Sequence, residues 1–168
     1  MTSPTNTRRP IATTDFSEHF PVDLLKQRNV DSNDVQLLGT DEARLKWSAQ
    51  LGTEAKSYFS IPSDSWLARL PSVTIGQWLG NYNAGNVQRT ASELQSHLSW
   101  ASTTRVLFCV SHRTIIATTW STFTRLWDCF LATHDDCPIV IPDDKGKKRS
   151  ALIFTPLGDI RYVREPDP

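Results

Sequence analysis

The segment from Thr118 to Leu131 constrains the fold of this chain more than any other. Read as a helix, it places four aromatic side chains at positions i, i+3, i+7 and i+10, on one continuous face. Those residues are Trp120, Phe123, Trp127 and Phe130. Burying four such side chains removes roughly 600–1,000 Å² from water, which contributes a gross ~15–25 kcal/mol. We therefore predict a buried helix, capped by Thr118 or Thr119, against which the neighbouring strands pack.

The length and the charge of the chain limit the kinds of protein it can be. Its 168 residues suffice for one domain with a sizeable core, and we expect a mobile tail over 1–10 and a single globular domain over 11–168. Lysine plus arginine and aspartate plus glutamate number 18 each, so the zero net charge makes nucleic acid an improbable main partner. No apolar run approaches the ~18 residues that cross a bilayer, and the N-terminus lacks the apolar stretch of a signal peptide. We expect a cytoplasmic protein that does not bind membranes.

A first helix is predicted from Asp41 to Phe59, with Thr40 or Asp41 as its cap and Gly52 as its weak point. Its apolar face consists of Leu45, Trp47, Leu51, Ala55, Tyr58 and Phe59. A shorter helix is predicted from Ala91 to about Leu98, because Thr90 and Glu93 have the spacing of a capping box.

Strands flank the aromatic helix on both sides. The near-continuous apolar run from Arg105 to Val110 predicts a strand buried on both faces, which a turn at 111–113 joins to 114–118 as a hairpin. Three further strands, at 138–141, 150–155 and 160–164, are separated by short turns and form a meander. The chain is therefore predicted as α+β: a mostly antiparallel sheet with a C-terminal three-stranded meander, packed on two or three helices on one face.

The segment from Ser60 to Arg89 has no clear periodicity. It is rich in proline, glycine and asparagine, which favour turns, and we predict a long loop with little regular structure. It also carries Trp66, Trp78 and Tyr82. Two interpretations remain open: these aromatics fill the edge of the core from a surface loop, or they form an aromatic recognition surface or dimer interface.

The region around the aromatic helix also has a family likeness. The run VLFCV precedes the helix, and DDCPIVI follows it. The pattern W-x-x-F-x-R-x-W-x-x-F-L, followed by an acidic pair and a P-I-V-I strand, resembles a small uncharacterised bacterial family, a domain of unknown function. Its positions here are Trp120, Phe123, Arg125, Trp127, Phe130, Leu131, Asp135, Asp136 and Pro138 to Ile141. The resemblance implies a bacterial cytosolic protein and assigns no catalytic residue.

The most suggestive polar cluster is the turn His134-Asp135-Asp136-Cys137, where the aromatic helix ends. The helix dipole disfavours carboxylates there, so Arg125, Lys145, Lys148 or a bound cation must offset them, unless the turn is simply solvated. Metal binding would add His112 as a fourth ligand, but no metal-site spacing supports it. A nucleophilic site would pair Cys137 or Cys129 with His112 or His134 as the base. Cys129 is predicted on the outer helix face, whereas Cys109 is predicted inside a buried strand.

The favoured hypothesis is a non-catalytic binding protein with no cofactor, and the specific role considered for it is an immunity-type inhibitor that binds a protein partner. Its predicted site residues are Trp66, Trp78, Tyr82, Arg125, Asp135 and Asp136. The alternative is a small hydrolytic or metal-dependent enzyme that uses the turn from His134 to Cys137. Nucleic-acid binding through Arg8, Arg9 and the basic tip at 145–149 is a weaker alternative, and a homo-oligomer is compatible with the sequence.

Overall fold

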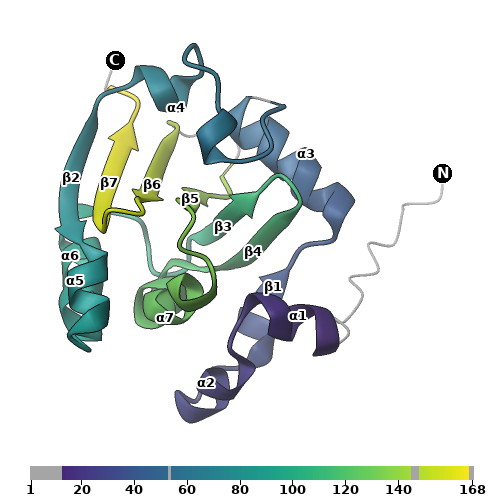
Figure 1. Ribbon diagram of the computed structural model, residues 1–168, viewed down its shortest axis with the longest axis vertical. Coiled ribbons are helices and arrows are strands. Elements are labelled where there is room, and N and C mark those ends of the chain that lie inside the picture. The colour runs from purple at the N-terminus through teal and green to yellow at the C-terminus, as the bar shows by residue number, and fades with distance from the viewer. Residues whose placement is uncertain (1–12, 53, 145–147, 167–168) are drawn as a thin grey trace.

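The computed structural model describes residues 13–52, 54–144 and 148–166, so the predicted tail over 1–10 lies outside the described residues. Within these residues, the chain forms a seven-stranded antiparallel sheet with the order β1-β4-β3-β5-β6-β7-β2 (Figure 1). The strands are β1 (Gln36–Leu37), β2 (Ser72–Gln77), β3 (Arg105–Ser111), β4 (Thr114–Thr119), β5 (Ile139–Pro142), β6 (Ser150–Phe154) and β7 (Asp159–Arg164). The predicted α+β fold and its C-terminal meander, β5-β6-β7, are confirmed.

Helices cover both faces of the sheet (Figure 1). One face carries α1 (Thr13–His19), α2 (Val22–Gln27), α5 (Trp78–Asn83), α6 (Val87–His97) and α7 (Trp120–Thr133). The other carries α3 (Thr40–Leu51) and α4 (Trp66–Arg69), and short 3₁₀ turns lie at Ser32–Asp34 and Tyr58–Ser60. The prediction that helices occupy one face is wrong, because the central strands present apolar side chains on both sides and each side is covered.

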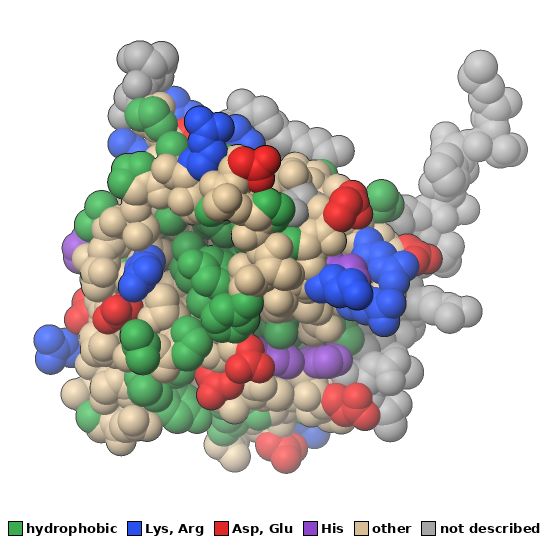
Figure 2. All heavy atoms as spheres, turned by 45° about the horizontal axis from the view of Figure 1, so that its top comes forward, with side chains coloured by type: hydrophobic (Ala, Val, Ile, Leu, Met, Phe, Trp, Pro, Cys, Tyr) green, Lys and Arg blue, Asp and Glu red, His purple; other side chains and the backbone are tan. Residues whose placement is uncertain are grey.

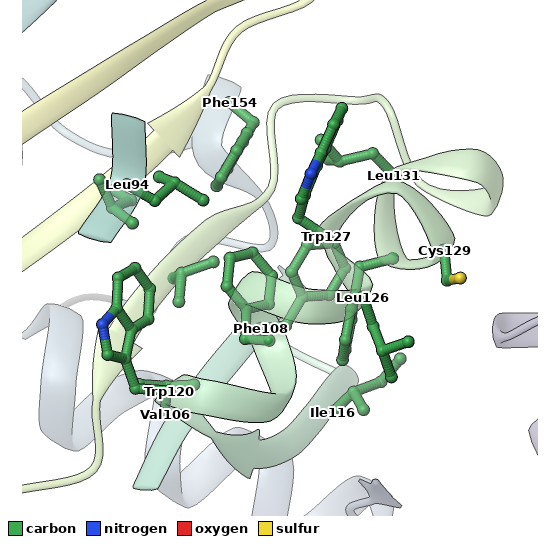
Figure 3. Packing of buried hydrophobic residues seen from close by; sticks show 14 of the residues in the cluster. Leu94, Val106, Phe108, Ile116, Trp120, Leu126, Trp127, Cys129, Leu131 and Phe154 are labelled. Carbon is green, nitrogen blue, oxygen red and sulfur yellow. The ribbon is translucent and has the colours of Figure 1, made fainter. Parts of the chain in front are cut away.

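Helix α7 organises the hydrophobic cluster on its face of the sheet (Figure 3). The four aromatic residues of its predicted stripe are all buried. Thr119, one of the two predicted caps, accepts a hydrogen bond from the Thr122 backbone N–H at 3.3 Å. The indole N–H of Trp127 donates to the Val87 carbonyl oxygen at 2.9 Å and so joins α7 to the first turn of α6.

Strand β3 divides its side chains between the two cores, as predicted for a strand buried on both faces. Val106 and Phe108 pack in the α7 cluster, whereas Leu107 and Cys109 pack in the cluster beneath α3 and α4. The strand pairs with β4 through the predicted turn at 111–113 and with β5 on its other side. This arrangement places β3 at the centre of the hydrophobic core.

Helix α3 ends at Leu51, eight residues before the predicted end. Gly52 adopts a left-handed conformation (φ 61°) and its N–H donates to the Ser48 carbonyl oxygen, which terminates the helix. The cap is Gly39, not Thr40 or Asp41. The predicted apolar face is also partly wrong: Trp47 and Leu51 are buried, whereas Leu45 is 72% exposed. Phe59, which lies beyond the helix, is 67% exposed.

The segment 60–89 was predicted as a long loop, and this prediction is wrong. It contains α4, strand β2, helix α5 and the start of α6. Strand β2 forms the sheet edge beside β7, and its register shifts between Thr74 and Gly76. Because of this irregularity, and because most residues of the strand are exposed, β2 lacks the alternation of buried and exposed residues from which a strand could be predicted. Helix α6 begins at Val87, four residues before the predicted start at Ala91.

Candidate functional site

A cavity of about 310 Å³ opens between α4, the segment before β3, and the ends of β5 and β6. Aromatic, basic and hydroxyl side chains line it together. They include Trp66, Trp100, Thr104, Lys148, Arg149 and Ser150. We call this the tryptophan cavity. Cavities of this size with a few convergent polar groups are the usual form of ligand and partner sites.

Trp66 forms one fixed wall of the tryptophan cavity. Ser65 caps α4 by accepting a hydrogen bond from the Leu67 N–H at 3.2 Å, which starts the short helix at Trp66. The indole N–H of Trp66 donates to the Gln50 carbonyl oxygen at 3.1 Å, so the ring is anchored to α3. Trp66 is only 9% exposed. Its ring orientation is therefore set by the fold.

Arg149 lies over the ring of Trp66. Its guanidinium carbon is 5.4 Å from the ring centroid, a cation–π distance. The same guanidinium donates to the Glu165 carboxylate at 2.6 Å, and the Arg149 backbone N–H donates to it at 2.8 Å. These hydrogen bonds lower the pKa of Glu165, and the one from the Arg149 backbone N–H has the largest effect. The planar cation is thus held on an aromatic face at the mouth of the cavity.

Trp100 connects the tryptophan cavity to the core. Its ring meets Trp120 of α7 edge-on, with the centroids 4.9 Å apart, and lies 6.4 Å from Tyr162. Behind the cavity, the Asp143 carboxylate accepts from Lys46 at 2.6 Å and pairs with Arg105 at 3.2 Å. Because these groups come from α3, β3 and the end of β5, the ion-pair cluster fixes the elements around the cavity.

The predicted aromatic site residues do not form one surface. Trp66 belongs to α4 and packs with α3 on one face of the sheet, whereas Trp78 and Tyr82 belong to α5 on the opposite face. Trp78 is 3% exposed and its indole N–H donates to the Thr155 carbonyl oxygen at 2.9 Å. Tyr82, which is 38% exposed, lies between the rings of Trp78 and Trp127. Of the two interpretations left open by the sequence, the one in which an aromatic side chain fills the edge of the core applies to Trp78.

The other predicted site residues, Arg125, Asp135 and Asp136, are exposed on α7 and its C-terminal turn and do not line the tryptophan cavity. Among the described residues, neither aspartate forms an ion pair with Arg125, and Lys145 lies outside that range. The negative charges of Asp135 and Asp136 favour the protonated form of His134, but this effect on its pKa is smaller than that of burial. Burial and the neighbouring His19, whose ring stacks on His134 at 5.4 Å, lower that pKa.

The cysteines are buried and their thiols are hard to ionise. Cys129, predicted on the outer face of α7, is fully buried on the side of the helix opposite Trp127 (Figure 3). That prediction is wrong because the N-terminal helices cover this side of α7, where Arg28 pairs with Asp128. Burial raises the pKa of Cys129 to about 11 and that of Cys137 to about 12. Neither environment activates a nucleophile.

His112 and His134 belong to different environments. The His112 ring donates from Nδ1 to the Lys56 carbonyl oxygen at 3.2 Å, beside α3. His134 stacks on His19 and lies near Phe108, on the α7 face. The set of His112 with His134, Asp135 and Asp136 is therefore not assembled, and residues 13–52, 54–144 and 148–166 contain no group of three or more side chains arranged to hold a metal ion.

Sequence reasoning singled out Trp66 but missed its partners in the cavity. Trp100 was not among the predicted site residues, and Arg149 was considered only as part of the basic tip at 145–149. The sequence does offer one signal, because tryptophan and arginine are both enriched at interaction sites. Their convergence depends on the strand order, which the local sequence does not encode.

The fold and the cavity together define an α+β protein with a recessed aromatic and basic site. The chain belongs to the family described as "Protein of unknown function (DUF2947)", whose family model matches residues 19–162. This confirms the resemblance to a domain of unknown function. No curated protein and no solved structure matches the chain. In the part of the chain that the structure describes, no helix has the length and apolar character needed to span a membrane.

Proposed function

We propose that this protein is a non-catalytic binding protein that captures a protein partner through the tryptophan cavity and its rim. The observation that carries the proposal is the anchored pair of Trp66 and Arg149 at the mouth of a cavity of about 310 Å³. Tryptophan and arginine are enriched among the residues that dominate binding energy, especially where they border a recess that a partner side chain can fill.

The chemistry of the rim indicates what the partner presents. Trp66 and Trp100 offer apolar faces, and the polar part of the lining combines the cations Arg149 and Lys148 with the Asp144 carboxylate and the Ser150 hydroxyl. A partner side chain with an apolar body and a polar, hydrogen-bonding end matches this lining. Leu45 of α3 and Phe59 of the following 3₁₀ turn are 72% and 67% exposed and offer further apolar surface.

Within this class, the specific role we favour is an immunity-type inhibitor that captures a toxin. A second copy of the chain is the other occupant that this surface admits. Sedimentation of the purified protein separates the two, because self-association raises the mass in the absence of any other protein.

The test is a tagged pull-down from the source cells, read by mass spectrometry, with Arg149→Ala as the site variant. Arg149 is half-exposed, so its removal leaves the core intact. The matched control is Arg89→Ala, which removes a more exposed ion-paired arginine from α6. We expect one stoichiometric protein with the wild type and the control, and at least tenfold less with Arg149→Ala.

Equal recovery with Arg149→Ala, or no stoichiometric partner in any sample together with a monomeric mass, would overturn the proposal. Trp78→Ala is not a suitable site variant, because Trp78 is buried and bonded to the turn after β6. Its loss would report on folding and not on binding.

A further inference from the structure

A second cavity, of about 280 Å³, lies between α3, residues 54–56 and the turn that joins β3 to β4. Its polar lining comes from Arg44, Trp47, Ser48, Glu54, Lys56 and His112. We call it the basic cavity. It shares no lining residue with the tryptophan cavity, although helix α3 contributes to both.

The basic cavity contains a buried donor that has no acceptor. Trp47 is 1% exposed, and its indole Nε1 is buried without a hydrogen-bond partner among the described residues. Three other buried tryptophans, Trp66, Trp78 and Trp127, donate to backbone carbonyl oxygens. Since a buried N–H without an acceptor costs about 1–3 kcal/mol, a ligand acceptor that reached the Trp47 indole N–H would remove this cost, and Trp47 is one of the residues that line the cavity.

Two side chains that line the basic cavity are also hydrogen-bond donors without an ion-pair partner among the described residues. Arg44 and Lys56 carry donors only, and neither forms an ion pair within the described part of the chain. The Lys56 carbonyl oxygen is already occupied, because it accepts from both the backbone N–H and the ring Nδ1–H of His112. The other nitrogen of the His112 ring, Nε2, is available to contact a ligand.

The charge of the lining fixes the sign of the ligand. Two permanent cations and a histidine face one carboxylate, that of Glu54, which is itself engaged by the Ser48 hydroxyl at 3.4 Å. Figure 2 shows basic side chains gathered around a histidine on this side of the molecule. A volume of about 280 Å³ is several times the ~30 Å³ share of a liquid water molecule, so a small oxyanion fits together with its waters.

We propose that the basic cavity is a binding site for an oxyanion, a phosphate or carboxylate group held by Arg44 and Lys56 above the Trp47 indole N–H. The proposal is independent of partner capture at the tryptophan cavity, because the two sites have separate linings. Arginine and lysine are the side chains that most often hold phosphate and carboxylate groups.

The experiment is a titration of the ¹⁵N-labelled full chain with inorganic phosphate, and separately with acetate, followed through the indole N–H resonances at constant ionic strength. The Trp47 resonance is assigned by its loss in Trp47→Phe. We expect it to shift and saturate with at least one of the two anions. The anion that saturates the shift of the Trp47 resonance shows whether the site binds a phosphate or a carboxylate group.

The variants Arg44→Ala and Lys56→Ala are expected to raise the apparent dissociation constant at least tenfold. Arg113→Ala is the matched control, since Arg113 is exposed on the same turn as His112 but does not line the cavity. It should leave the titration unchanged. A Trp47 resonance that does not saturate with either anion, or that saturates equally in Arg44→Ala, would overturn the assignment.

Discussion

At the scale of single residues, the Arg28–Asp128 ion pair ties the N-terminal helices to α7. The two terminal guanidinium nitrogens of Arg28 donate to the two carboxylate oxygens of Asp128 at 2.6 Å, and this hydrogen bonding to Asp128 raises the pKa of Arg28. Arg28→Ala leaves a largely buried carboxylate without its partner. We expect a loss of about 1.5–3 kcal/mol in the free energy of unfolding, measured by urea denaturation.

The control for this prediction is Arg89→Ala. It breaks the Arg89–Glu93 pair on the surface of α6, where Arg89 is 70% exposed. Exposed pairs of this spacing contribute about 0.3–0.5 kcal/mol. Similar losses for the two variants would show that the Arg28 bond contributes no more than a surface ion pair.

The buried thiols make stability depend on alkaline pH. In the folded state the pKa is about 11 for Cys129 and about 12 for Cys137, because burial disfavours the thiolate. In the unfolded chain, cysteines ionise near pH ~8.5. The unfolded state therefore releases these protons first as pH rises. Their contribution to stability is complete below about pH 8 and declines as pH rises through 9 toward 11.

This dependence is measured as the free energy of unfolding at pH 8 and pH 10, for the wild type and Cys137→Ala. Other groups that ionise in this range affect both proteins equally. We expect a smaller fall between the two pH values in Cys137→Ala, because one buried thiol no longer contributes. Equal falls would mean that Cys137 ionises as readily in the folded state as in the unfolded chain.

At the scale of the elements, α7 depends on Trp127 for its contact with α6. The ring is fully buried and its N–H donates to the Val87 carbonyl oxygen. Trp127→Ala opens a large cavity and leaves that carbonyl without its donor, so we expect a loss of about 3–5 kcal/mol by urea denaturation. Trp127→Phe keeps most of the apolar volume and should cost clearly less. Equal losses would assign the effect to the hydrogen bond and not to packing.

The elements also show which parts of the fold the local sequence encodes. Helix α7 and strand β3 were predicted because a complete apolar pattern lies within each segment. Strand β2 was missed because it exists through pairing with β7, more than 80 residues later, and buries little of its own surface. The end of α3 was misplaced because one glycine in a left-handed conformation overrides the apolar periodicity beyond it.

The same distinction holds for the candidate site. Trp66 was singled out by its residue type, but its anchoring to Gln50 and its contact with Arg149 join segments that are far apart in the chain. The exposure of Cys129 was misjudged for a related reason: the helix pattern cannot show that α1 and α2 cover that side of α7. Contacts of high sequence separation thus determine both the site and the errors.

At the scale of the whole molecule, the strand order predicts a gradient of local stability. Strands β3 and β5 lie inside the sheet with both faces buried, whereas the two-residue β1 and the half-exposed β2 form its edges. Opening a central strand requires disruption of both cores, so its amides exchange only on near-global unfolding. Hydrogen exchange of the full chain, read by mass spectrometry, should therefore show β3 and β5 as the slowest peptides and β2 as clearly faster. Protection in β2 equal to that in β3 would mean that a second chain covers this edge, because an edge strand is protected when its free N–H groups are paired.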